Sequence, residues 1–337
     1  MKRLSNYELL RIVSILLISL MHGISSAYGS HYVGNYIAHV GVNAVGNMGV
    51  TLFVLISGYF GIRLRASKVW QLWSTMFFYS LLLFAAQCYL HEVPLPQEDG
   101  KAFLKLLYVA FTPATSNTWW FCTSYLIVLL LSPFLNKICD SISQRQFQYL
   151  LAVLLAVYSL SPTFLMHSLS GSANGKCTEN MILAYFLGRY IALYGIPKVI
   201  SRHAALLFTG CCGLIFVVDY FVFDPLFLCK DHSLFIILGA VCIFHFFGGI
   251  NIATPWVAEA IRYAAGFVFP FYLLNVFLIH HLEFQCAPLA DSPSYLGYFL
   301  LVQAEVLAIT VPIELLRRFL MGRLVTKVSG FLDRRFA

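Results

Sequence analysis

Long apolar runs follow one another along the whole chain, and they limit what it can fold into. A helix needs about 20 largely apolar residues to cross the hydrocarbon core of a bilayer. The runs are too long for strands and do not alternate, which disfavours a sheet. We therefore predict an all-α, polytopic transmembrane bundle of about ten helices, with eight or eleven as alternatives. The predicted spans are residues 7–28, 40–61, 69–90, 118–137, 147–166, 179–196, 204–223, 232–250, 263–282 and 295–316.

The composition agrees with one membrane domain. Hydrophobic residues make up 60% and charged residues 11% of the 337 positions, whereas a soluble domain carries about 25% charged residues. No long polar linker separates two halves, so we expect a single domain over residues 1–337 with no appended soluble domain. The first 28 residues look like a signal peptide, but Glu8 and Arg11 stand where its apolar region begins. We therefore expect a first helix that is retained.

Basic residues are distributed unevenly among the predicted loops. With a cytoplasmic N-terminus, the ten spans place seventeen Lys and Arg residues on the inner side and four on the outer side, and Arg11 lies within the first span. Inner loops of membrane proteins carry such an excess. The distribution predicts that both termini are cytoplasmic in a multi-pass protein of the inner (cytoplasmic) cell membrane. The four outer residues are Lys101, Lys105, Lys176 and Lys230.

The first span carries three ionisable residues, Glu8, Arg11 and His22. Such residues are costly inside a bilayer and often mark function. Glu8 and Arg11 are three residues apart and can pair on one helix face. Arg11 and His22 share a face about 16 Å apart along the axis, because their separation is close to three turns. Either Arg11 reaches lipid phosphates and His22 is a hydrogen-bonded interior group, or His22 transfers a proton and Arg11 binds an anion from the cytoplasm.

Several segments resemble one family in the same order along the chain. The run N-Y-E-L-L-R-I-V-S-I-L-L-I-S-L-M-H, residues 6–22, resembles the first helix of the acyltransferase-3 family, which includes bacterial polysaccharide O-acetyltransferases, with Glu8 in the place of a common acidic residue. Further segments are similar to later family motifs: G-V-T-L-F-V-L-I-S-G-Y-F (49–60), W-W-F-C-T-S-Y-L-I-V-L-L-L-S-P-F-L (119–135), Y-F-L-G-R-Y (185–190) and F-P-F-Y-L-L-N (269–275).

The resemblance implies a membrane O-acyltransferase. It implies transfer of an acyl group, acetyl by default, from cytoplasmic acetyl-CoA or another acyl-CoA to a hydroxyl of a surface polysaccharide or lipid-linked glycan. His22 would be the general base, or alternatively carry the acyl group. Arg11, with Arg63, Arg65 and Lys68 of the first inner loop, would contact the CoA phosphates. For the three loop residues, membrane topology alone is an equally good explanation.

Five other residues are secondary site candidates. Ser57 and Tyr59 belong to an S-G-Y segment that lacks the G-x-S-x-G elbow of hydrolases, so we expect them to pack or to shape the site. Trp119 and Trp120 are expected either to anchor the helix at the membrane interface or to stack on carbohydrate. Glu305 falls near the middle of the last span, the most costly depth for a carboxylate, and is a further catalytic candidate.

Some features leave alternatives open. Asn275 stands where the family often has His, although His280 and His281 follow soon after. A transporter or flippase for a glycan or lipid intermediate is the main alternative function, and a sensor or scaffold is another. A transporter more often shows internal repeats or broken helices, and neither is visible in the sequence. No metal is expected, because the nine cysteines have no metal-binding spacing.

Overall fold

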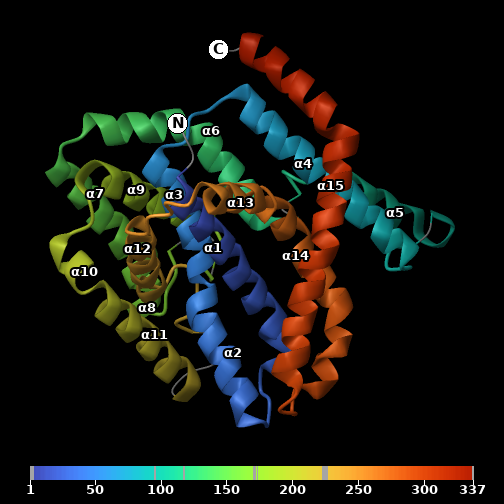
Figure 1. Cartoon of the computed structure of the whole chain (residues 1–337), viewed down its shortest axis with the longest axis horizontal. Coiled ribbons are helices and arrows are strands. Elements are labelled where there is room, and N and C mark those ends of the chain that lie inside the picture. Colours follow the sequence, from blue (N-terminus) through green and yellow to red (C-terminus); the bar gives the residue numbers. More distant parts are fainter. Residues whose placement is uncertain are drawn as a thin grey trace.

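The regular elements of the described chain are helices (Figure 1). The structure is a computed structural model and describes residues 4–335 except 95, 117, 170, 171, 173 and 222–226. In chain order the α-helices are α1 Ser5–Gly23, α2 Val33–Gly46, α3 Met48–Phe60, α4 Ala66–Tyr89, α5 Pro96–Phe111, α6 Trp120–Ser141, α7 Gln144–Leu155, α8 Ser161–Phe164, α9 Thr178–Tyr194, α10 Lys198–Arg202, α11 Ala204–Phe221, α12 Leu234–Gly248, α13 Pro255–Ala265, α14 Val268–Leu282 and α15 Tyr295–Arg335.

The predicted all-α membrane bundle is confirmed. Among the described residues, seven helices are long and apolar enough to span a bilayer, or eight if the bent pair α13–α14 forms one span. The predicted spans 179–196 and 232–250 correspond to α9 and α12, which have 17 and 15 residues. The count of ten therefore remains a prediction. The two ends of the described chain lie at the same end of the molecule (Figure 1), and their cytoplasmic location remains a prediction from the loop charges.

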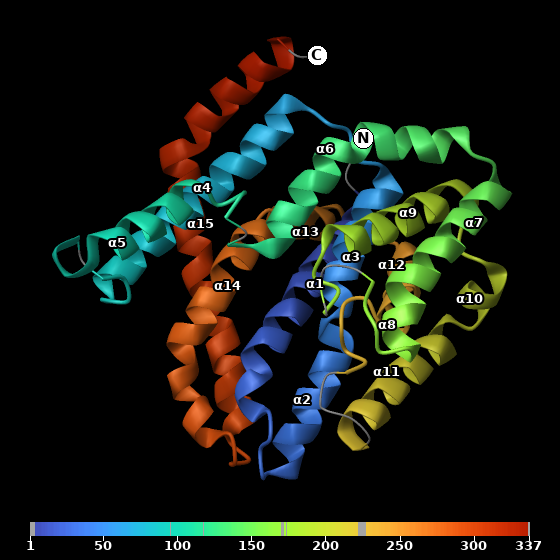
Figure 2. The ribbon, with the colours of Figure 1, turned by 180° about the vertical axis from the view of Figure 1, so that it is seen from behind.

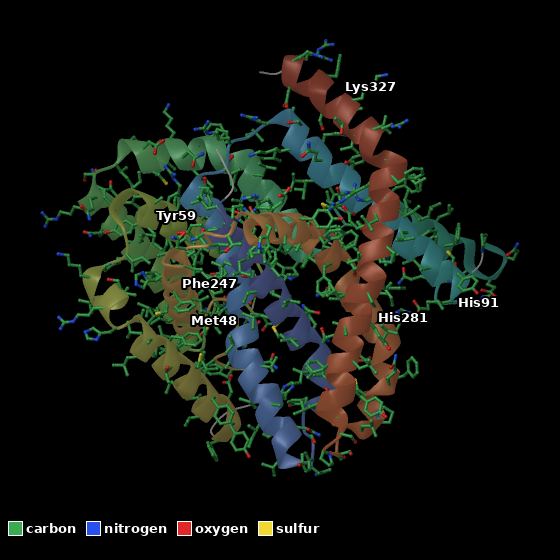
Figure 3. The ribbon with its side chains drawn as sticks, viewed as in Figure 1. Met48, Tyr59, His91, Phe247, His281 and Lys327 are labelled. Carbon is green, nitrogen blue, oxygen red and sulfur yellow. The ribbon has the colours of Figure 1, made fainter. Side chains whose placement is uncertain are left out.

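Two elements differ from the sequence analysis. The last helix, α15, continues for 41 residues to Arg335 instead of ending near residue 316, and Lys327 lies on the part that extends beyond the bundle (Figure 3). The segment expected as one straight span at 263–282 is bent by 48° between α13 and α14. A broken helix is thus present, although the sequence showed no sign of one. The Nη2 of Arg318 donates a 2.7 Å hydrogen bond to the Gly266 carbonyl at this bend, which satisfies a group that the break frees.

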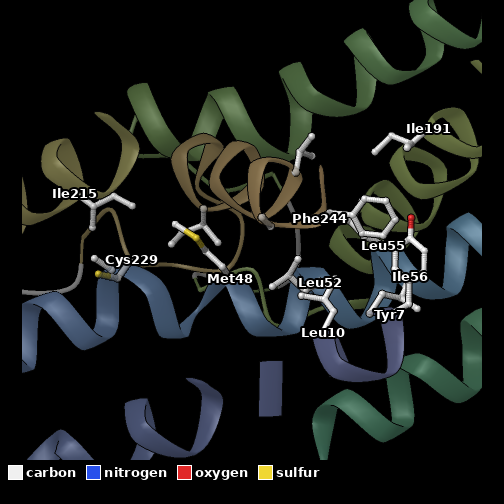
Figure 4. Close-up of a cluster of buried hydrophobic side chains, with 14 of the residues drawn as sticks. Tyr7, Leu10, Met48, Leu52, Leu55, Ile56, Ile191, Ile215, Cys229 and Phe244 are labelled. Carbon is white, nitrogen blue, oxygen red and sulfur yellow. The ribbon is translucent and has the colours of Figure 1, made fainter. Parts of the chain in front are cut away.

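Helix α1 lies in the middle of the bundle and packs against α3, and α3 in turn packs against α9 and α12. Figure 2 shows α6 running beside α9 on the other side of the molecule. A large apolar cluster joins α1, α3 and α12 (Figure 4). Leu10, Leu52 and Phe244 are at its centre and are almost completely buried. Burial on this scale holds α3 in one rotational position about its axis, because turning the helix would expose these side chains.

Backbone contact between α3 and α9 is unusually close. A Cβ atom added to Gly58 would collide with the Tyr185 carbonyl, and one added to Gly188 would collide with the Leu55 carbonyl and lie 2.8 Å from the Tyr59 nitrogen. Small residues at such crossings allow transmembrane helices to approach each other. The two glycines are therefore required by packing.

We expect Gly188→Ala to lower the free energy of unfolding by about 1–3 kcal/mol, because the added methyl meets backbone atoms that cannot rotate away. Gly210→Ala is the matched control, since a Cβ on this helical glycine of α11 meets nothing within 4 Å. The control should be neutral or slightly stabilising, as Ala is a better helix former than Gly. Thermal unfolding of both variants in detergent measures the difference, and equal effects would contradict the packing argument.

Candidate active site

A cavity of about 1030 Å³ runs through the bundle between α1, α3, α4, α6 and α14. Arg11 and Lys68 line one part of it, and Lys176, Asp231 and His280 line another. By the loop charges, the first group belongs to the predicted inner side and the second to the predicted outer side. The cavity therefore extends along most of α1, and groups from both predicted faces of the membrane border one continuous space.

Helix α3 contributes one face to this cavity. The lining residues Val50, Phe53, Ser57 and Phe60 recur every three or four positions, which is the spacing of one side of an α-helix. The opposite side carries the four buried residues of α3 that pack in the core, Met48, Leu52, Leu55 and Ile56. The same close packing that fixes α3 thus determines which of its residues face the cavity.

His22 lies on the cavity wall near the end of α1 and is partly buried. Among the described residues, no group forms a hydrogen bond or ion pair with its imidazole. A buried polar side chain normally has such a partner. The two roles considered for His22 from the sequence therefore both remain predictions, and the described structure adds that its imidazole borders the cavity.

Arg11 lines the cavity on the same helix, one side-chain nitrogen being 3.0 Å from the Glu8 carboxylate. The Glu8 side chain is 6% exposed and the Arg11 side chain 31% exposed. The carboxylate holds the arginine by one of its nitrogens, as the i, i+3 spacing predicted. The rest of the guanidinium can donate hydrogen bonds into the cavity.

Ser57 and the two tryptophans also border the cavity. The Ser57 hydroxyl donates to the Phe53 carbonyl at 3.0 Å and lies 3.4 Å from the Tyr125 hydroxyl, so it is bonded back to its own helix. Trp119 is 9% exposed and its indole donates a 3.2 Å hydrogen bond to the Leu273 carbonyl. Trp119 is therefore an interior residue that joins the start of α6 to α14. Its neighbour Trp120 also lines the cavity.

Four other candidates are not among the residues that line the cavity. Arg63 and Arg65 are exposed on the loop between α3 and α4. The ring of Tyr59 packs against Tyr7 and Phe244 with centroids 5.3 Å from each, on the side of the molecule away from His281 (Figure 3). Glu305 accepts a 2.8 Å hydrogen bond from Gln285, which gives this intramembrane carboxylate a partner away from the cavity.

Comparison with known proteins decides the family. The model of the acyltransferase-3 family, described as an acyltransferase domain, matches residues 4–311. The chain belongs to the acyltransferase-3 family. It is therefore a multi-pass membrane acyltransferase, which needs an acyl donor and, in general terms, a glycan or lipid acceptor. Neither the curated proteins nor the solved structures contain a significant match to the chain.

Asn275, at the end of the F-P-F-Y-L-L-N segment, stands where the family often has a histidine. Asn275 is fully buried on α14, neither polar atom of its amide has a hydrogen-bond partner among the described residues, and it is not among the residues lining the cavity. His280 borders the cavity one and a half turns later. The described residues contain no group of three His, Cys, Asp or Glu side chains that could hold a metal ion.

Sequence reasoning missed Asp231. This residue precedes α12, is 2% exposed, and borders the cavity. Burial raises its pKa from an ordinary value of 3.8 to about 7, and the positive charge of Lys176 opposes the shift. The only sequence signal was a short polar segment, K-D-H-S, between two apolar runs, which looks like any membrane loop.

We expect Asp231→Asn to stabilise the fold increasingly as the pH rises from about 4 to 8. In that range the unfolded carboxyl has lost its proton while the native carboxyl keeps it up to about pH 7, so the native state binds more protons and the wild type loses stability with each pH step. Asparagine does not titrate. Thermal unfolding in detergent at pH 5, 6, 7 and 8 tests this, and a variant-minus-wild-type difference that does not change with pH would contradict it.

Proposed function

We propose that the protein is an O-acetyltransferase of the inner membrane that moves an acetyl group from cytoplasmic acetyl-CoA to a hydroxyl of a surface-polysaccharide or lipid-linked glycan. One observation carries the proposal: Arg11 and His22, about three turns apart on α1, border one continuous cavity. A transfer between compartments needs such a space, since the donor and the acceptor approach from opposite sides. The identity of the acyl group and of the acceptor comes from the family resemblance.

His22 is proposed as the general base. A neutral imidazole can accept a proton from a hydroxyl group. In the proposed step, one ring nitrogen takes the proton of the acceptor hydroxyl while the hydroxyl oxygen attacks the thioester carbonyl carbon. The carbon–sulfur bond then breaks, CoA leaves as a thiolate, and the imidazolium returns the proton to the sulfur. The products are the acetyl ester and free CoA.

Arg11 and Lys68 are proposed to bind the phosphates of the donor. Both border the cavity, and a guanidinium matches two phosphate oxygens at once. Arg63 and Arg65 belong to the same inner loop but lie outside the cavity, so we assign them a weaker, longer-range attraction. The apolar walls formed by Ile18, Val50 and Phe53 suit the long, flexible pantetheine arm that must extend from the phosphates towards His22.

We expect His22→Gln to lower the rate of acetyl transfer by about 10²–10⁴-fold, because glutamine cannot accept the hydroxyl proton. Purified full-length protein in lipid nanodiscs is given radiolabelled acetyl-CoA and a glycolipid extract of the source organism's membranes, and labelled glycan is counted. His203→Gln, an exposed histidine that does not line the cavity, is the control and should keep full activity. Transfer that persists in His22→Gln would refute the base role, and movement of glycan without acetyl-CoA would favour a transporter.

We expect Arg11→Lys to raise the KM for acetyl-CoA about tenfold. Lysine keeps the positive charge beside Glu8 but loses the planar fork that binds two phosphate oxygens. Arg65→Lys is the matched control outside the cavity and should change the donor KM by less than twofold. Steady-state kinetics with varied acetyl-CoA measures both, and equal effects would mean that Arg11 serves only the ion pair.

A further inference from the structure

Asp231 is a buried acid on the cavity wall for which the proposed chemistry has no role. It is 2% exposed, and neither carboxylate oxygen has a hydrogen-bond partner among the described residues. Lys176 borders the same part of the cavity, and the structure records no ion pair between either residue and another described side chain. A buried polar group left without a partner lowers the stability of the fold, and more so when it is charged.

The segment around Asp231 is held firmly in place. The Asp231 N–H donates to the Asn174 carbonyl at 3.1 Å, and the Asn180 amide donates to the carbonyls of Asp231 and Gly175 at 3.0 and 3.3 Å. Gly175 has φ +74°, and a Cβ there would lie 2.5 Å from the His232 nitrogen. Two loops are thus joined by backbone contacts, so the carboxylate keeps a set position on the cavity wall.

A second buried aspartate shows what a purely structural carboxylate looks like in this chain. Asp219 is fully buried on α11, and its two oxygens accept hydrogen bonds from the backbone N–H groups of Leu228 and Cys229 at 2.8 and 3.2 Å. Asp219 does not line the cavity. Asp231 has the same burial without these bonds, which leaves its oxygens available to a molecule that enters the cavity.

We propose that Asp231 and Lys176 form the acceptor subsite of the cavity. The proposal rests on the proposed function, and it assigns the recognition of the acceptor to these two residues. The Asp231 carboxylate accepts hydrogen bonds from hydroxyl groups of the acceptor, and the Lys176 ammonium donates to its oxygens. A carboxyl group accepts hydrogen bonds when it is ionised and can also donate one when it is protonated, so in either state this end of the cavity suits a ligand rich in hydroxyl groups.

Trp120 adds an apolar surface to the same cavity. A sugar presents hydroxyls at its edge and C–H groups on its faces, so a carboxylate and an indole together match both of its surfaces. With the acceptor held by Asp231 and Lys176, one of its hydroxyls can be directed to His22, which borders the same space. Asp231 is in this view a positioning residue, because it binds the acceptor and does not exchange a proton with the reacting oxygen.

The test compares Asp231→Asn with Asp219→Asn in full-length protein in lipid nanodiscs, using acetyl-CoA and the glycolipid extract titrated by its sugar content. Transfer is measured at pH 8, where the wild-type carboxyl is ionised, so Asp231→Asn removes the charge while keeping the shape, and the variant is expected to fold at least as stably as the wild type. We expect its acceptor KM to rise about tenfold or more, as for loss of a hydrogen bond to a charged group, with the donor KM unchanged. Asp219→Asn should lower the thermal stability but leave the acceptor KM unchanged.

The lysines provide a second matched pair. Lys176→Gln should raise the acceptor KM, whereas Lys230→Gln should not, because Lys230 lies over the Phe227 ring and does not line the cavity. An unchanged acceptor KM in Asp231→Asn would overturn the subsite. It would leave the proposed function standing, because the His22→Gln assay tests acetyl transfer separately. Equal losses of kcat in the two aspartate variants, in proportion to stability, would show a structural role and also overturn it. If the wild type transfers no acetyl group, the proposed function fails and the subsite fails with it.

Discussion

Close backbone contact on one side of α3 is the constraint on which the rest of the structure depends. Gly58 and Gly188 bring α3 and α9 together at the distance of backbone atoms, which larger residues would prevent. On two other sides of α3, Leu10 of α1 and Phe244 of α12 pack against the helix in the apolar core. With three sides committed to packing, the fourth side of α3 faces α4, α6 and α14, and the cavity lies there.

Two contrasting kinds of polar group occur inside this bundle. Some are fully satisfied: the Glu314 carboxylate accepts hydrogen bonds from Tyr79, Arg317 and Arg318, and Arg318 also ties down the bend between α13 and α14. Others reach the cavity, as His22 and Asp231 do, and neither oxygen of the Asp231 carboxyl has a hydrogen-bond partner among the described residues. A fold keeps unsatisfied polar groups at a cost in stability, so those that face a cavity are the groups expected to meet a substrate.

The first helix could be interpreted from sequence because its chemistry and its geometry are both local. A spacing of eleven residues places Arg11 and His22 on one face of any regular helix, and three residues allow Glu8 to pair with Arg11, which the structure confirms. Glu305 is different. Its depth in the membrane remains a prediction, and its hydrogen-bond partner, Gln285, stands twenty positions earlier in the chain, beyond the reach of a periodicity argument.

By itself the sequence determined that this protein is an all-helical membrane bundle of the acyltransferase-3 family with two polar residues on one face of its first helix. Hydrophobic run length and helical period decide the bundle and the shared helix face, and both act between neighbours in the chain, whereas the family follows from the order of the motif segments and the family match. Only the tertiary structure decided that Lys68 borders the cavity while Arg65 does not, that Trp119 is interior, and that Asp231 joins Lys176 on the wall. Those outcomes depend on how distant segments pack, and a charged loop residue looks the same in sequence whichever way its side chain faces.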